Sequence, residues 1–207
     1  MADGPLVPPE GEAKRLRVGV LASQGDFAAH ARMLTELGAD AQEVRTAEEL
    51  AELDAFVIPG GESTTIAKAI DRDGLAEPIR AHHAAGRPIL GTCAGMILCG
   101  REHLGLIDAS CRRNAFGRQL ASFEADLEIG GIGPEPLRAV FIRAPWVEEH
   151  GSGVEVLAEV EGHPVVIREG SVLACAFHPE LTDDPRLHAL LMAMASEAKA
   201  PYSATDR

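Results

Sequence analysis

The chain has little positive charge and few aromatic residues. It contains 19 Lys and Arg against 32 Asp and Glu, a net charge of −13, and aromatics make up 4% of it. Proteins that bind nucleic acids need cationic surface for the phosphates, and those that bind single strands also need aromatic platforms. We therefore expect no nucleic-acid partner. The chain also lacks the basic amphipathic helix typical of membrane-surface proteins, so we expect no membrane partner.

Long apolar runs and paired cysteines are also missing. No uninterrupted apolar stretch approaches the roughly 20 residues of a membrane span, and residues 1–12 hold prolines and acids where a signal peptide has basic and apolar regions. A cytoplasmic protein is therefore expected. The four cysteines lie singly, with no C-x-x-C spacing, which argues against zinc ribbons and redox dithiols.

The composition, 46% hydrophobic and 25% charged over 207 residues, fits one globular domain. We expect tails at 1–15 and 198–207, where no apolar period exists, and a single domain over 16–197. Apolar runs alternate with helical patterns early in the chain, which predicts βαβ units and a parallel sheet. The expected strands are 17–22, 55–58 and 88–91, and the expected helices are 26–37, one from about 63, 75–85 and 95–103. Later apolar segments predict more strands of a mixed sheet, some antiparallel, at 119–129, 137–142, 154–160, 163–168 and 171–177, before a helix at 185–197.

Cys93 lies in the sequence G-T-C-A-G at 91–95, directly after the apolar run 88–90. This is the cysteine counterpart of the G-x-S-x-G nucleophile elbow, in which a strand turns sharply into a helix. Gly91 and Gly95 would allow the tight turn and close packing, and the N–H of Ala94 would be a donor to an oxyanion. A packed core cysteine in a glycine-flanked turn is the alternative from this segment alone.

A base and a carboxylate follow another expected strand, in the sequence His178-Pro179-Glu180. Pro179 favours an extended His178, and in extended chain residues 178 and 180 face the same side. Glu180 would then orient the His178 ring, which would activate a thiol from elsewhere. Alone, the segment is better explained as a strand-terminal histidine; with the elbow, catalysis is favoured. A zinc site on Cys93, His178 and Glu180 lacks a fourth convincing ligand.

A second glycine-rich turn, P-G-G-E-S-T-T at 59–65, follows the strand at 55–58. It lacks the spacing and the lysine of a Walker loop. Either it caps the next helix through Ser63 or Thr64, or it presents backbone N–H groups near the nucleophile. The pair His82-His83 is expected on a solvated helix face. The remaining histidines have no neighbouring residues that would predict a metal site or a catalytic role: His30, His103, His150, His163 and His188.

These motifs together resemble the class I glutamine amidotransferases, and more narrowly the glutaminase subunits of pyridoxal 5′-phosphate synthase. The closer likeness covers about 17–194 and includes Q-G at 24–25, the 59–65 turn, R-N-A-F-G-R-Q at 113–119, F-I-R-A-P at 141–145 and H-P-E-L-T at 178–182. The chain differs from the usual pattern of these subunits in two small ways. Ala22-Ser23 stands in place of a more apolar pair, and Ala115 stands in place of a usual serine.

The resemblance implies an α/β fold of the class I glutamine amidotransferase-like (flavodoxin-like) type, a three-layer sandwich around a mixed, largely parallel sheet. It implies hydrolysis of L-glutamine to glutamate and ammonia, without cofactor or metal, and delivery of ammonia to a barrel-shaped synthase partner. Gln24 would face the active site and this partner. The site residues implied are Cys93, His178 and Glu180 for catalysis, Gly61 and Ala94 for the oxyanion, and Gly60, Gly61, Glu62, Arg113, Ile142 and Arg143 for glutamine.

Two other readings stay open. The same triad would serve a γ-glutamyl hydrolase or the amidotransferase of a different synthase. Alternatively, the chain is a non-catalytic redox or stress protein in which Cys93 is oxidised reversibly. Because a diglycine peptide flips at little cost, we also expect that the partner sets the Gly60-Gly61 backbone and that the isolated chain is a weak glutaminase.

Overall fold

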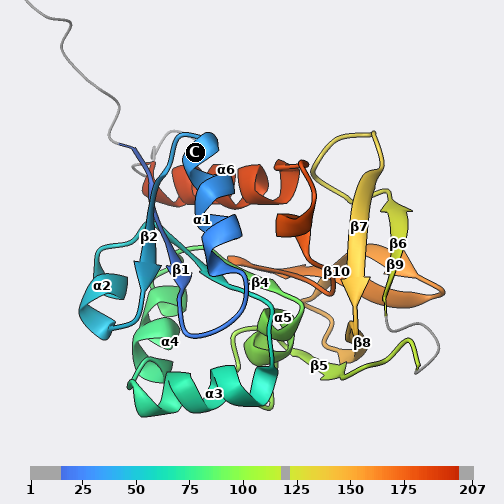
Figure 1. The fold of residues 1–207 in the computed structure, drawn as a ribbon, viewed down its shortest axis with the longest axis horizontal. Coiled ribbons are helices and arrows are strands. Elements are labelled where there is room, and N and C mark those ends of the chain that lie inside the picture. Colours follow the sequence, from blue (N-terminus) through green and yellow to red (C-terminus); the bar gives the residue numbers. More distant parts are fainter. Residues whose placement is uncertain (1–14, 118–121, 201–207) are drawn as a thin grey trace, which may run out of the picture.

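A computed structural model of the chain describes residues 15–117 and 122–200. Its centre is a seven-stranded sheet with the order β2-β1-β3-β4-β11-β10-β9 (Figure 1). The first five strands in this order run parallel, and β10 pairs antiparallel with both β11 and β9. The fold class expected from the sequence, a mixed and largely parallel sheet between helices, is confirmed. The strands are β1 (Arg17–Leu21), β2 (Asp40–Val44), β3 (Ala55–Ile58), β4 (Ile89–Thr92), β9 (Glu155–Val160), β10 (His163–Glu169) and β11 (Val172–Cys175).

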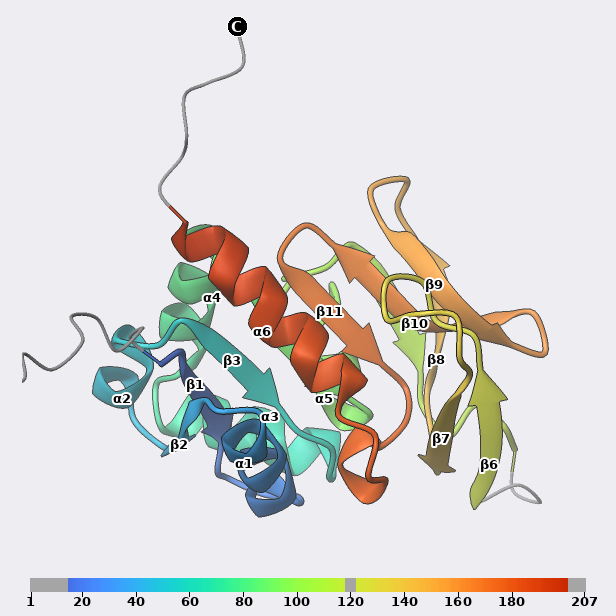
Figure 2. The same cartoon turned by 90° about the horizontal axis from the view of Figure 1, so that it is seen from above.

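Helices cover both faces of this sheet, which explains why β3, β4 and β11 are buried along their whole length. In Figures 1 and 2, α1 and α6 lie on one face, and α3, α4 and α5 lie on the other. Helices α1, α3, α4 and α6 begin within one residue of the expected positions, whereas α2 was not expected and α5 is shorter than expected. Their bounds are α1 (Phe27–Glu36), α2 (Ala47–Ala51), α3 (Ser63–Arg72), α4 (Ala76–Ala84), α5 (Ala94–Cys99) and α6 (Arg186–Lys199).

Two separate two-stranded sheets lie on the side of the molecule that carries β9 and β10 (Figure 2). They pair β5 (Ala109–Arg112) with β8 (Trp146–His150), and β6 (Ser122–Leu127) with β7 (Leu137–Ile142). The prediction that 119–129 and 137–142 extend the main sheet is therefore wrong. In β6 and β7 half-buried or buried residues alternate with exposed ones, so these strands cover the core with one face only.

Several elements differ from the sequence-based expectation. Strands β2, β5 and β8 and helix α2 were not predicted from the sequence. The helix expected at 95–103 ends at Cys99, because Gly100 leaves the helical conformation and packs against the Ala109 carbonyl. Residues 1–14 and 201–207, where the tails were expected, and 118–121 lie outside the described part of the chain.

Candidate active site

Three parallel strands end side by side, and each is followed by a segment that carries candidate site residues. Gly60 follows β3, Cys93 follows β4, and His178 comes shortly after β11. A Cβ added to Gly60 would lie 2.5 Å from His178 Cε1 and 3.3 Å from Cys93 Cβ. The three segments are therefore in contact, as expected for the carboxyl ends of neighbouring parallel strands.

Cys93 occupies a strained turn between β4 and α5. Its φ of 49° and ψ of −105° are unusual for a residue with a side chain. The flanking glycines are required by space, because a Cβ on Gly95 would lie 1.9 Å from the Ile58 carbonyl oxygen and one on Gly91 would lie 2.7 Å from the Gly95 oxygen. The elbow geometry predicted from G-T-C-A-G is thus present, with the thiol at its apex.

A half-buried His178 and a buried Glu180 form a pair beside this thiol. His178 Nδ1 lies 2.8 Å from Glu180 Oε1, and the Glu180 side chain is 1% exposed. Burial opposes protonation of the ring, but the neighbouring Cys93 thiol and the Glu180 carboxylate outweigh it and raise the pKa of His178 to about 10. Burial also opposes the Glu180 anion, yet hydrogen bonds with His178 and His30 hold the pKa of Glu180 well below its ordinary value.

The expectation that residues 178–180 are extended, with both side chains on the same side, is wrong in part. His178 is outside the helical region, with a φ of −109° and a ψ of 86°, as a residue before proline should be. Residues Pro179–Leu181, however, form a short 3-10 turn, η1, instead of extended chain. That turn folds Glu180 back under the ring of His178.

Two histidines that the sequence analysis set aside extend this chain of contacts. His30, on α1, has its Nε2 3.2 Å from Glu180 Oε2 and 3.4 Å from Thr92 Oγ1. His30 Nδ1 lies 2.8 Å from Nε2 of His188, on α6, and both rings are fully buried. His82 is buried as well, against Phe56, so its expected place on a solvated face is wrong.

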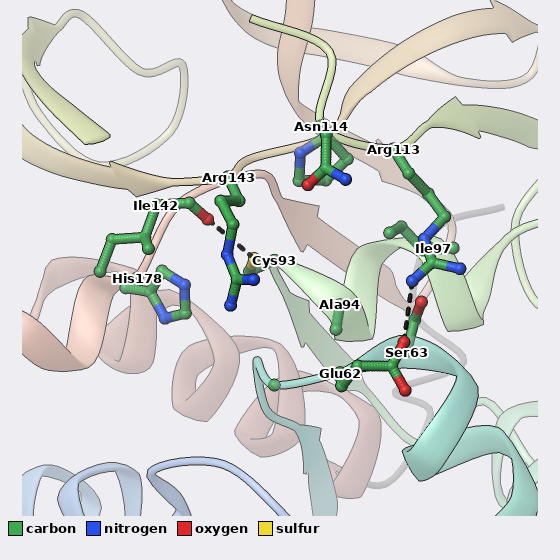
Figure 3. A pocket seen from close by; sticks show the side chains of 12 residues that line it. Glu62, Ser63, Cys93, Ala94, Ile97, Arg113, Asn114, Ile142, Arg143 and His178 are labelled. Carbon is green, nitrogen blue, oxygen red and sulfur yellow. Dashed lines mark hydrogen bonds and ion pairs between the residues drawn. The ribbon is translucent and has the colours of Figure 1, made fainter. Parts of the chain in front are cut away.

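A pocket opens over the thiol, and Figure 3 shows the side chains that surround it. Most of the expected glutamine-binding residues meet here. Ser63, Ile97, Asn114 and Pro145 also line the pocket but were not predicted to be site residues. Asn114 has a φ of 47°, a conformation in which asparagine is enriched, and it follows Arg113 in the R-N-x-F motif. The lining residues are Gly61, Glu62, Ser63, Cys93, Ala94, Ile97, Arg113, Asn114, Ile142, Arg143, Pro145 and His178.

Glu62 and Arg113 form an ion pair on one wall of the pocket, with Arg113 Nη2 2.8 Å from Glu62 Oε1. Glu62 is also the N-cap of α3, a role predicted for Ser63 or Thr64, because its carboxylate accepts from the N–H groups of Thr64 and Thr65. Hydrogen bonds from the Thr65 hydroxyl and then from these N–H groups lower the pKa of Glu62 to about 2. The wall therefore presents both signs of charge.

Ile142 and Arg143 form the opposite wall. The Cys93 thiol donates to the Ile142 carbonyl oxygen, with the sulfur 4.0 Å from the oxygen. Arg143 has a φ of 45°, and Figure 3 shows its side chain directed into the pocket. A backbone acceptor and a cation thus face the sulfur from the β7 side.

Gln24 lies behind the diglycine turn. Its Oε1 accepts from the Glu62 N–H at 3.0 Å. A Cβ on the next residue, Gly25, would lie 1.9 Å from the Gly60 carbonyl oxygen. Gln24 does not appear among the described residues that line the pocket, so it reaches the site through the backbone of the turn.

The other three thiols differ from Cys93 in their surroundings. Burial raises the pKa of Cys99 and of Cys111 to about 12, and it raises the pKa of Cys175 well above its ordinary value. Among the described residues, no cluster of three or more side chains is arranged to hold a metal ion. In the same part of the chain, no helix has the length and apolarity needed to cross a membrane.

Comparison with known proteins accounts for this arrangement. The model of the SNO glutamine amidotransferase family matches residues 20–197. The chain is 56% identical to "Pyridoxal 5′-phosphate synthase subunit PdxT" of Acidothermus cellulolyticus over 89% of this chain and 96% of that protein. It is 54% identical to the subunit of the same name from Frankia alni, over 85% of this chain and 93% of that protein.

A solved structure agrees with these relatives. A crystal structure described as a glutamine amidotransferase superposes with a TM-score of 0.82 at 47% identity, covering 86% of this chain and 98% of the other. The elbow thiol, the histidine–glutamate pair and these similarities lead to one assignment: the chain belongs to the SNO glutamine amidotransferase family.

Proposed function

We propose that this chain hydrolyses L-glutamine to L-glutamate and ammonia, and passes the ammonia to a synthase subunit that makes pyridoxal 5′-phosphate. The observation that carries the proposal is the meeting of the Cys93 thiol with His178, whose Nδ1 is bound to Glu180 at 2.8 Å, in one pocket. The relatives named as subunits of pyridoxal 5′-phosphate synthase support the choice of partner. The free thiols suit the reducing conditions of the cytoplasm, where we place the protein.

The geometry supports a covalent mechanism. The Cys93 thiol transfers its proton to His178 and its sulfur attacks the side-chain carbonyl carbon of glutamine, and the resulting oxyanion accepts hydrogen bonds from the N–H groups of Ala94 and Gly61. His178 donates a proton to the departing nitrogen as the C–N bond breaks, which leaves a γ-glutamyl thioester and ammonia. His178 then takes a proton from water, which attacks the thioester and releases glutamate and the thiol. Glu180 keeps Nδ1 of His178 protonated, so that Nε2 faces the sulfur.

The walls of the pocket suit the zwitterionic end of glutamine. The carboxylate of Glu62 fits an α-ammonium group, and the guanidinium of Arg143 fits an α-carboxylate. Arg113 neutralises part of Glu62 through their ion pair, so it would orient Glu62 as well as contact substrate. Gly60 and Ile142 would shape the space around the reacting amide.

The direct test measures ammonia release from glutamine with and without a purified barrel synthase subunit. Cys93→Ala should abolish release, and Glu180→Gln should reduce it heavily. Cys111→Ala is the matched control, because this thiol is not among the pocket-lining residues of the described chain, and it should keep wild-type turnover. Unchanged turnover in Cys93→Ala would remove the assignment.

Two results would favour the rival functions. Release of glutamate from γ-glutamyl peptides, faster than from glutamine, would indicate a γ-glutamyl hydrolase. No turnover of either substrate, with reversible oxidation of Cys93 that does not depend on Glu180, would indicate a redox protein. Full turnover by the isolated chain would contradict the expectation that the partner sets the Gly60-Gly61 backbone.

A further inference from the structure

The triad does not end at Glu180. Oε1 of this carboxylate is bound to His178, and Oε2 is turned toward His30 Nε2 at 3.2 Å. His30 is on α1 and His188 is on α6, far from the triad in sequence, yet both rings are fully buried. A buried histidine pair in contact with a buried carboxylate needs a defined arrangement of protons, because facing lone pairs would be costly there.

The contacts select one tautomer of His30. If Nδ1 carried the only proton, the Nε2 lone pair would face the Glu180 carboxylate, which is unfavourable. With the proton on Nε2, His30 forms its 3.2 Å ion-pair contact with Glu180 Oε2 through a protonated nitrogen, although the two groups are not aligned as a full hydrogen bond, and Nδ1 accepts from Nε2–H of His188 at 2.8 Å. Burial, and then the nearby His30, lower the pKa of His188 to about 3, so this ring stays neutral and able to donate. The proton order is therefore His188 to His30 to Glu180.

The groups around this chain come from four elements. His30 meets Glu180 in η1, His188 on α6 and the Thr92 hydroxyl at the end of β4. Glu180 also faces His178, and it interacts with the buried thiol of Cys175. These contacts link α1 and α6, on one face of the sheet, to η1 and to the carboxyl end of β4, so a shift of His30 would reach the His178 ring through Glu180.

We infer that His30, held in one tautomer by His188, is a positioning residue that fixes Glu180 and through it the His178 ring. The inference rests on the proposed function for its kinetic readout, but it also makes a claim about Cys93 that needs no turnover. Without the His30 donor, Glu180 loses a partner of its anionic form, and His178 loses both its orientation and part of its stabilisation as imidazolium. Cys93, which His178 activates, should then react more slowly with electrophiles at low pH.

The variants distinguish the loss of the N–H donor at Nε2 of His30 from the loss of its side-chain volume. His30→Leu removes the donor, whereas His30→Gln places an amide nitrogen where Nε2 stands and should restore it. His30→Asn places its amide nearer Nδ1 and should not. His82→Leu is the matched control, because His82 is a buried histidine on α4, on the other face of the sheet.

In the holoenzyme with its synthase partner, His30→Leu should lower kcat for glutamine at least about tenfold and leave KM within about twofold, as expected for a residue that acts through its neighbour. The acid limb of kcat/KM should move to higher pH, because protonation of Glu180 becomes easier. His30→Gln should stay near wild type. The inference is overturned if His30→Leu matches His82→Leu in kcat and in the acid limb, or if KM alone changes.

The second readout is alkylation of Cys93 by iodoacetamide in the isolated chain, followed by mass spectrometry of its peptide. His30→Leu should slow alkylation at pH 6 relative to pH 9, and His30→Gln should not. An unchanged ratio overturns the inference even if the wild-type chain shows no glutaminase activity, so failure of the two proposals can be told apart. If His30→Leu does not fold, the contrast between His30→Gln and His30→Asn decides.

Discussion

At the scale of single residues, the His178–Glu180 pair should make the stability of the protein depend on pH. The lowered pKa of Glu180 gives stability that is present above its unfolded value of about 4.3 and is lost as pH falls below it. The raised pKa of His178 gives stability that is complete below its unfolded value of about 6.5 and is lost as pH rises through about 10. Both contributions are therefore complete only between about pH 4.5 and 6.5.

The prediction concerns Glu180→Gln. The difference in free energy of unfolding between wild type and this variant should be largest near pH 5.5 and smaller at pH 10, measured by urea unfolding with circular dichroism. Cys99 and Cys111, whose raised pKa values do not involve Glu180, titrate equally in both proteins, so they cancel. Glu149→Gln, an exposed carboxylate 3.7 Å from Arg101, should give a small difference at both pH values. A Glu180→Gln difference that grows toward pH 10 would contradict the proposed ion pair.

At the scale of elements, the turn after β1, at 24–25, packs against the turn after β3, at 60–61, and limits its backbone conformation. Gly25 has a φ of 90°, and a side chain there would overlap the Gly60 carbonyl oxygen. Gly25→Ala should therefore displace the Gly60-Gly61 peptide and lower the glutaminase rate. Gly86→Ala is the control, because Gly86 has a φ of 73° with nothing within 4 Å of an added Cβ.

Both variants should lose about 1–2 kcal/mol of stability from the left-handed backbone, as measured by chemical unfolding. Only Gly25→Ala should also lose activity, with a lower kcat at saturating glutamine. Equal activity in the two variants would mean that the contact between the turns does not set the backbone around the expected oxyanion site.

Some of these features could be predicted from the sequence, and others could not. The elbow was predictable because its signal is local: Gly91 and Gly95 flank Cys93 within five residues. Strand β2 was missed because only Val44 of its five residues is buried, so it carries almost no apolar pattern. His30 was missed because its partners, Glu180 and His188, come from the far end of the chain, and a lone histidine carries no signal of such a contact.

At the scale of the whole molecule, the site lies between two parts of unequal burial. Its floor is the edge of a sheet whose strands β3, β4 and β11 are buried throughout. Its outer wall comes from β7 and the loop around Arg113, and β7 pairs only with the half-exposed β6 among the described strands. Loop residue Phe116 packs against Phe123, Phe141 and Trp146, which joins this loop to the two small sheets.

Hydrogen exchange followed by mass spectrometry should report this division. Amides of β3, β4 and β11 should exchange slowest, because their opening requires disruption of the main core, and amides of β6 and β7 should exchange faster through local opening. Glutamine bound to a Cys93→Ala variant, which cannot turn over, should slow exchange in the wall at β7 and 111–117 and leave the floor strands unchanged. Protection that appeared only in the floor strands would show that substrate does not bridge the two parts, and would move the binding site away from Arg113 and Arg143.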